Sequence, residues 1–199
     1  MRDQRSPDTP RDAIGLPDPE RFVCADGTVE DRMRNVEFKA EVRDLPLAGL
    51  IVQELGARWI ARLEQTDTYF RVPHARLKKR ETLGEPPEWI FYERADSPRP
   101  RVSSFMIYSE AEARERFGIA PLPVLVVVRK SRDLYMHANV RMHLDRVEDL
   151  GDFLELEAMV TKACPEEACR AQVTALRAAL APVLGEPISA GYSDLLMAG

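Results

Sequence analysis

Charged and apolar side chains alternate near the end of the chain, over residues 140–157 (VRMHLDRVEDLGDFLELE). Successive side chains of a strand point to opposite faces, so residues of one parity share a face. On an ordinary half-buried strand such a polar face is merely solvated, so a chemical role requires other strands to repeat the pattern. Charged or titratable residues that share odd numbers here include Arg141, His143, Asp145, Glu155 and Glu157.

Basic side chains repeat this alternation in several other segments. Like charges gathered in a partly desolvated space repel one another, so a strand face of this kind needs an anionic ligand. Arginine forks and lysine ammonium groups are well suited to phosphate oxygens. The basic residues that share polar strand faces are Lys39, Lys78, Arg80, Arg94, Lys130, Arg132 and Arg141.

Three carboxylates, Glu37, Glu155 and Glu157, accompany these cations. A carboxylate beside a phosphate is repulsive unless a divalent cation lies between them. Oxygen ligands on adjacent strands suit Mg²⁺ or Mn²⁺, which proteins bind through a few carboxylates together with water and substrate phosphates. The residues therefore predict a site for a metal-bound polyphosphate.

The elements that must position these groups are mostly amphipathic strands. We expect a helix over residues 45–65, capped by Asp44, and a short helix over 110–118 that Ser109 caps and Gly118 ends. A third helix is expected after Pro165, over residues 165–184. Within residues 123–147 we expect two strands joined by a turn near 131–133. The remaining expected strands are residues 35–43, 66–73, 74–81, 88–96, 103–108 and 151–160.

Many amphipathic strands with few helices favour an α+β fold built on a closed antiparallel β-barrel. One face of each strand would point into the lumen, and the helices at 45–64 and 165–184 would cover the apolar outer face. The N-terminal residues 1–33 contain four prolines and no sustained period, so we expect a flexible leader there. The barrel domain is expected over residues 34–199.

Composition limits the class of protein. The chain has 199 residues and a formal net charge of −5, which argues against a general nucleic-acid binder. It has no run of about 18 apolar residues and no apolar N-terminal stretch of the signal-peptide type, so we expect no membrane association. The cysteines Cys24, Cys164 and Cys169 lack a zinc-type spacing, and a reducing cytoplasm is the expected compartment.

Taken in order along the chain, these segments resemble the CYTH superfamily, the triphosphate tunnel metalloenzymes. The resemblance spans roughly residues 34–196, and the stretch ending in LGDFLELE is its most specific part. Among the family's members are class IV adenylate cyclases, thiamine triphosphatases and inorganic triphosphatases. The pieces that carry the resemblance are NVEFK (35–39), LKKRE (77–81), FYER (91–94), VRKSR (128–132), RMHLDRVEDLGDFLELE (141–157) and the closing GYSDLL (191–196).

The resemblance implies a tunnel barrel that binds a triphosphate and uses one or two Mg²⁺ or Mn²⁺ ions. By position, it implies metal binding by Glu37, Glu155 and Glu157, and catalytic roles for Lys39, Arg141 and Asp145. Asn35 departs from the family signature, ExExK, because an amide replaces the first glutamate and brings no charge to a second metal. The implied phosphate-binding residues are Lys39, Lys78, Arg80, Arg94, Lys130, Arg132 and Arg141.

Two reactions remain open at this point. Water attacking the terminal phosphorus of tripolyphosphate or thiamine triphosphate would make a triphosphatase, whereas the ribose hydroxyl of ATP attacking the α-phosphorus would make an adenylate cyclase. The alternative is a module that binds polyphosphate or a nucleotide without turnover. The expected partner is a small-molecule triphosphate, and the expected oligomeric state is a monomer or homodimer.

Overall fold

The computed structural model describes residues 33–72, 75–94, 99–118 and 120–199. Except for Met33, the expected flexible leader lies outside the described residues. The elements, in chain order, are β1 (Met33–Val42), α1 (Leu45–Glu54), β2 (Arg58–Phe70), β3 (Arg76–Thr82), β4 (Glu88–Arg94), β5 (Arg101–Tyr108), α2 (Glu110–Phe117), β6 (Val124–His137), β7 (Val140–Val147), β8 (Gly151–Met159), α3 (Glu166–Leu180), the 3-10 helix η1 (Ala181–Val183), β9 (Leu184–Pro187) and α4 (Tyr192–Ala198).

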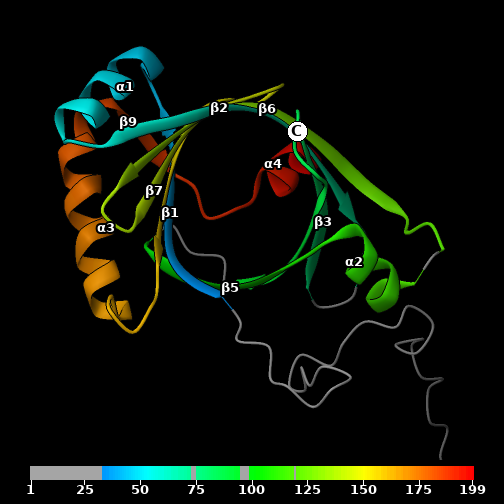
Figure 1. Cartoon of the computed structure of the whole chain (residues 1–199). Coiled ribbons are helices and arrows are strands. Elements are labelled where there is room, and N and C mark those ends of the chain that lie inside the picture. Colours follow the sequence, from blue (N-terminus) through cyan, green and yellow to red (C-terminus); the bar gives the residue numbers. More distant parts are fainter. Residues whose placement is uncertain (1–32, 73–74, 95–98, 119) are drawn as a thin grey trace, which may run out of the picture.

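Eight strands form a closed antiparallel barrel, as the sequence predicts. The strand order is β5-β4-β3-β2-β6-β7-β8-β1, and β5 pairs with β1 to close the ring. Strand β9 adds to the edge of β1. Figure 1 looks into the ring, with the strands around its rim. Closure removes free strand edges and leaves an inner face on every strand.

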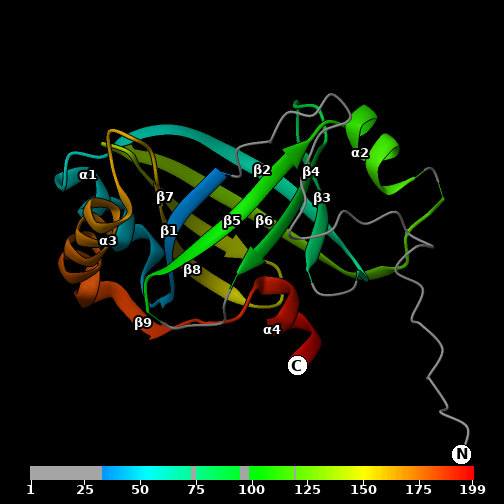
Figure 2. The ribbon, with the colours of Figure 1, turned by 90° about the horizontal axis from the view of Figure 1, so that it is seen from below.

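Helices α1 and α3 cover one side of the barrel, and α2 lies on the opposite side (Figures 1 and 2). The largest apolar cluster lies under α1 and α3, where Phe38, Met142 and Leu156 of the barrel meet Val52 of α1 and Val173 of α3. These side chains have even numbers on β1, β7 and β8, so the apolar outer face of the strands forms the core. The odd-numbered polar residues are left for the lumen.

Two smaller apolar clusters complete the packing. Helix α2 places Phe117 against Leu77, Phe91 and Met106 on the outer face of β3, β4 and β5. Its predicted caps are confirmed, because Ser109 forms a capping box with Glu112. The third cluster joins Tyr192 of α4 to barrel residues. Among the described helices, none combines the length and apolar character that a bilayer crossing requires.

The predicted helix over 45–65 is wrong in its second half. Asp44 does cap α1, accepting a hydrogen bond from the Leu47 backbone at 2.9 Å, but the helix ends at Glu54. Gly56 has φ +81°, in the left-handed region where glycine carries no Cβ penalty, and β2 follows. Trp59 and Leu63 are four residues apart, a spacing compatible with one face of either a helix or a regular strand. In β2 a shift of register between Trp59 and Ala61 leaves Trp59 on the outer face and Leu63 in the lumen.

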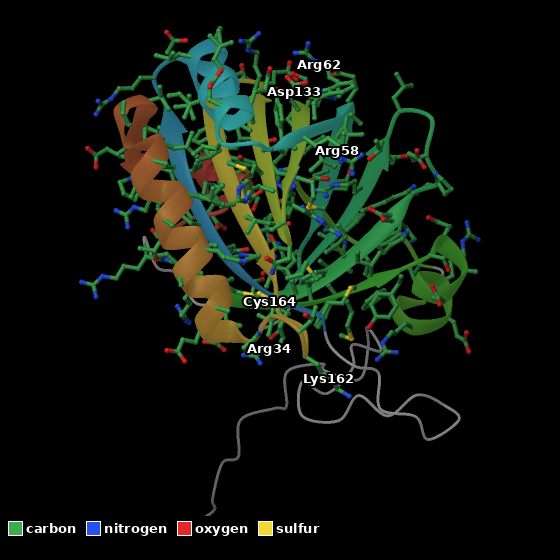
Figure 3. All side chains as sticks on the ribbon, turned by 60° about the vertical axis from the view of Figure 1, so that its left-hand side comes forward. Arg34, Arg58, Arg62, Asp133, Lys162 and Cys164 are labelled. Atoms are coloured by element: carbon green, nitrogen blue, oxygen red, sulfur yellow. The ribbon has the colours of Figure 1, made fainter. Side chains whose placement is uncertain are left out.

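The predicted turn near 131–133 is also wrong. Strand β6 runs unbroken to His137, and the turn is at residues 138–139, where Ala138 has φ +50°. The polar residues that suggested a turn lie on the two faces of the strand instead. Arg132 points into the lumen, whereas Asp133 lies on the outer face near Arg62 of β2, at 3.8 Å (Figure 3). Strand β9 and helix α4 were not expected from the sequence.

Candidate functional site

The lumen of the barrel holds a cavity of about 850 Å³. Asp145 is completely buried and is held by other lumen residues. Arg94 belongs to β4, but its side chain lies outside the described part of the structure. The sequence-predicted site residues that line the cavity are Glu37, Lys39, Lys78, Arg80, Lys130, Arg132, Arg141, Glu155 and Glu157.

The pairing of β1, β8 and β7 sets acidic and basic groups side by side in two rows. Glu157 pairs with Glu37 on one side and with Arg141 on the other. In the next row Glu155 pairs with Lys39 and His143. Directly opposed residues on neighbouring strands lie about 4.5–5.5 Å apart at Cβ, so each row forms a compact cluster of charge.

Three side chains from these rows form a possible metal site. One ligand atom from each of His143, Glu155 and Glu157 can be chosen so that all lie within 4.8 Å of one another. Burial and the charge of Arg132 lower the pKa of His143, which favours the neutral imidazole that a metal requires. The sequence hypothesis named Glu155 and Glu157 as ligands and gave His143 no role in metal binding.

The amide oxygen of Asn35 also indicates that the cavity binds a ligand or a metal ion. Asn35 is 3 % exposed, lines the cavity, and its Oδ1 has no hydrogen-bond partner among the described residues. A buried, unpartnered oxygen is costly unless a ligand satisfies it. Glu37, the third predicted carboxylate, instead accepts a hydrogen bond from Arg101 Nε at 2.7 Å. Two carboxylates, an imidazole and an amide oxygen are a chemically suitable set for a divalent cation.

A single buried carboxylate, Asp67 of β2, holds three of the predicted phosphate-binding cations. Its oxygens accept hydrogen bonds from Arg80 Nε at 2.7 Å, Arg80 Nη2 at 2.8 Å, Lys78 Nζ at 2.9 Å and Lys130 Nζ at 3.0 Å. Burial alone would raise the pKa of Asp67, but Arg80, Lys130 and Lys78 together lower it well below its usual value. Asp67 therefore remains charged and fixes the positions of the cations.

A second buried carboxylate orients Arg132. Asp145 accepts two hydrogen bonds from the Arg132 guanidinium, both at 2.6 Å, and one from the Tyr192 hydroxyl at 2.9 Å. Burial raises the pKa of Asp145, but Arg132 outweighs it, and the pKa falls to about 2. The same guanidinium donates to Glu155 at 3.0 Å. Arg132 thus bridges Asp145 and Glu155, and Glu155 belongs to the possible metal site.

Lys130 has a lower pKa than an ordinary lysine. Burial lowers its pKa most, and the charges of Arg80, Arg132 and Lys78 lower it further, whereas Asp67 raises it. The resulting pKa is about 7, compared with an ordinary value of 10.5. Lys130 therefore changes charge near neutral pH, and an anion bound beside it would favour the protonated form.

Helix α4 lies against one end of the lumen, within the outline of the ring in Figure 1. Its Tyr192 is buried, and the Lys39 ammonium lies 3.8 Å from the centre of the Tyr192 ring. Asp194 of α4 binds Arg76 of β3 at 2.9 Å. These contacts fix α4 to strands on both sides of the barrel and place it next to the cationic residues.

The sequence hypothesis missed Asp67, Arg101 and Tyr192. Asp67 shares the parity of Gln65 and Tyr69, but half of its strand had been read as helix, which hid the alternation. Arg101 lies at the start of β5, two residues before the strand that was expected. Tyr192 belongs to the GYSDLL piece of the resemblance, and its hydroxyl was given no role because a residue far along the chain supplies its partner.

The chain was compared with families of known proteins and with solved structures. Residues 33–178 match the model of the CYTH domain. No curated protein matches the chain. The PH1012 protein of Pyrococcus horikoshii is 26% identical, with a TM-score of 0.66 over 81% of this chain and 98% of that chain.

Two further solved structures share the fold. A candidate adenylate cyclase from Vibrio parahaemolyticus has a TM-score of 0.64 at 16% identity, over 84% of this chain and 99% of that one. A candidate adenylyl cyclase from Hippeastrum, described as having a dominant triphosphatase activity, has a TM-score of 0.59 at 14% identity. That match covers 83% of this chain and 96% of the Hippeastrum protein.

Proposed function

The chain belongs to the CYTH domain family, and from this membership we propose that it is a metal-dependent enzyme that hydrolyses a triphosphate-containing substrate. One observation carries the proposal: acidic residues that can hold a divalent cation share two strand rows with basic residues inside a single cavity. Glu157 lies between Glu37 and Arg141, and Glu155 between Lys39 and His143. Phosphoryl transfer requires this combination of positioned cations and a metal.

The phosphate chain is assigned to the basic side of the cavity. Lys78, Arg80 and Lys130, held by Asp67, would bind its oxygens, and Arg132 would bind those nearer the metal. Arg94, Lys39 and Arg141 complete the proposed phosphate-binding set. Carboxylates hold Lys78, Arg80, Lys130 and Arg132 in place before the substrate arrives, so these four side chains add alignment for in-line attack as well as charge neutralisation.

The proposed metal ligands are Glu155, Glu157 and His143. Glu37 lies on the neighbouring strand β1, where it pairs with Glu157. Mg²⁺ or Mn²⁺ held there would withdraw negative charge from the phosphoryl oxygens. In the proposed reaction water attacks the terminal phosphorus and the bond from that phosphorus to the bridging oxygen breaks. The rest of the substrate leaves as a diphosphate that carries the bridging oxygen, and the attacked phosphorus is released as orthophosphate. Asp145, which is completely buried, contributes by orienting Arg132.

The second candidate reaction is adenylate cyclisation. It is favoured by the name of the structural neighbour from Vibrio parahaemolyticus. Hydrolysis is placed first because the Hippeastrum neighbour, also named for a cyclase, is described as having a dominant triphosphatase activity. Both reactions use the same basic cavity and differ in which phosphorus is attacked.

The test is turnover of tripolyphosphate, thiamine triphosphate and ATP with Mg²⁺ and with Mn²⁺, scoring orthophosphate, pyrophosphate and cyclic AMP together. Orthophosphate without cyclic AMP is the expected result. Equal amounts of cyclic AMP and pyrophosphate from ATP would establish the cyclase instead. Metal-dependent binding of triphosphate without any product would establish a binding module.

A further inference from the structure

The polarity of the lumen changes along β6 and β2, whereas the residues of β1, β7 and β8 that line the cavity are all polar or charged. On β6 the inward residues run Lys130, Arg132, Leu134 and Met136, from basic to apolar. The antiparallel neighbour β2 also changes from charged to apolar, from the buried Asp67 to Leu63. Leu63 pairs with Arg132. Tyr192 of α4 lies over Lys39 and within 5.5 Å of Lys130. On β6 and β2 the apolar end is therefore the end away from α4.

The opposite side of the barrel repeats this change. Arg76, which binds α4, pairs with Tyr92 of β4, and Tyr92 pairs with Phe105 of β5. Two residues farther from α4, Ile90 pairs with Ile107. We name the inward apolar side chains of this end the apolar wall; it consists of Leu63, Ile90, Phe105, Ile107, Leu134 and Met136.

The apolar wall faces the cavity instead of packing into the core. All six side chains line the cavity, and none belongs to the three apolar clusters formed by the described residues. Ile107 is 40% exposed. Apolar surface left in contact with water within a cavity is stabilised when a ligand covers it, and such surface marks binding grooves.

The size of the cavity leaves room for more than a phosphate chain. Cavities of roughly 300–1,000 Å³ enclose drug-sized ligands, and this one measures about 850 Å³. The charged groups that suit phosphate occupy its basic end and border the apolar wall, where Arg141 pairs with Met136 and Lys78 pairs with Ile90. The space beside Leu134 and Met136 is continuous with that end, because Leu134 pairs with His143 and Met136 pairs with Arg141.

We propose that the apolar wall binds an uncharged, aliphatic group esterified to the phosphate chain, so that the substrate is the triphosphate of an apolar alcohol. This inference rests on the proposed function, since it assigns the phosphates to the basic end. Glu85 and Glu88 also line the cavity, and their carboxylates would repel a second anionic group. The wall is mainly aliphatic, which suits a hydrocarbon chain better than a group recognised through hydrogen bonds.

The experiment compares methyl, butyl and octyl triphosphate by calorimetric binding with Mg²⁺ and, separately, by turnover. If each added methylene is buried against the wall, affinity rises up to about fourfold per methylene until the wall is filled. Leu134→Asn should lower the octyl-to-methyl affinity ratio by at least about tenfold. Leu125→Asn is the matched control, because Leu125 lies on β6 with the opposite parity and is 37% exposed; it should leave the ratio unchanged.

The outcomes separate the subsite from the reaction. Equal affinities for the three esters, with tripolyphosphate still hydrolysed, would overturn the apolar subsite and leave the proposed function standing. Rising affinity without turnover would support the subsite and overturn hydrolysis. Tighter binding of thiamine triphosphate, whose organic group is cationic, than of octyl triphosphate would overturn the choice of an uncharged group. Failure of every triphosphate to bind would overturn both inferences.

Discussion

Asp67 binds Arg80 through both carboxylate oxygens, at 2.7 and 2.8 Å, and Arg80 lines the cavity proposed to hold an anion. The carboxylate is 1% exposed and also accepts from Lys78 and Lys130. It acts as an internal counter-ion when no phosphate is bound. A buried cluster of cations without it would be strongly repulsive.

Replacing Asp67 with asparagine should therefore destabilise the free protein more than the liganded one. We expect Asp67→Asn to lower the free energy of unfolding by about 3–5 kcal/mol, because the buried Lys130 and the partly buried Lys78 and Arg80 lose their charge partner. Tripolyphosphate should then raise the melting temperature more in the variant than in the parent, since it replaces the lost anion. Denaturant unfolding with and without tripolyphosphate measures both effects.

The matched control for this substitution is Asp133→Asn, which removes a carboxylate from the outer face of β6, next to β2. Asp133 contacts Arg62 and Trp59 outside the lumen. The control should change stability by less than about 1 kcal/mol and leave the effect of tripolyphosphate unaltered. Equal behaviour of the two variants would contradict the counter-ion role of Asp67.

The charge of Lys130 should make phosphate binding depend on pH. Its pKa of about 7 means that it loses its charge as the pH rises through neutrality, and affinity for tripolyphosphate should fall over the same range. The neighbours that set this pKa are Asp67, Arg80, Arg132 and Lys78. Titrations between pH 6 and 9 should show the fall in the parent and a flatter profile in Lys130→Met. Identical profiles would remove Lys130 from the binding site.

The lowered pKa of Lys130 has the opposite effect on the stability of the ligand-free protein, which should rise with pH. Lys130 has a lower pKa in the folded state than its ordinary value of 10.5, so the unfolded chain binds more protons between about pH 7 and 10.5. The contribution of Lys130 to stability therefore rises with pH across that window, by at most about 1.4 kcal/mol per pH unit. Comparing the pH dependence of unfolding in the parent and in Lys130→Met isolates this contribution.

Glu157 should be required for metal-dependent turnover. It lies in the possible metal cluster and pairs with Glu37 and Arg141. Glu157→Gln keeps the shape of the side chain but removes its charge, so we expect loss of tightly bound Mn²⁺ and at least about a hundredfold loss of kcat. Glu148→Gln, in the exposed turn after β7, is the control. Unchanged metal affinity in Glu157→Gln would place the metal elsewhere.

Asn35 should set how many metal ions the cavity holds. Asn35 lines the cavity and its Oδ1 has no hydrogen-bond partner among the described residues, but an amide adds no charge. Asn35→Glu would add a buried carboxylate near Glu37 and Glu157, so the metal-free variant should melt at a lower temperature. Mg²⁺ or Mn²⁺ should restore its stability and bind with a higher stoichiometry in calorimetry. A variant that metal fails to restore would show that position 35 lies beyond reach of the ions.

The hydrogen bond from Tyr192 of the C-terminal helix to Asp145 of the barrel should stabilise the fold. Tyr192→Phe removes the hydroxyl that donates to Asp145 at 2.9 Å and keeps the ring over Lys39. The expected loss is about 1.5–3 kcal/mol in the free energy of unfolding, the usual range for a hydrogen bond to a charged group. Denaturant unfolding checks it, and a loss below about 0.5 kcal/mol would mean that Arg132 alone holds Asp145.

The two-residue period of a strand was enough to identify most of the predicted site residues that line the lumen. Glu37 with Lys39, Lys130 with Arg132, and Glu155 with Glu157 share a parity along the chain, and each pair lines the cavity. Neighbouring inward residues on one strand are always two positions apart, so this assignment needs no knowledge of the strand's partners. The barrel class follows from the same alternation repeated along the chain.

Only the tertiary structure decided which strands are neighbours and therefore which charges meet. The side chains of Asp67, Arg80 and Lys130 are brought together by the pairing of β2 with β3 and β6. Residues 58–65 had a spacing compatible with helix or strand, and barrel closure selected the strand. Tyr192 reaches Asp145 across 47 positions of sequence. Local periodicity determines the face of a side chain, but contacts between distant segments depend on register and closure, which the packing of the whole domain sets.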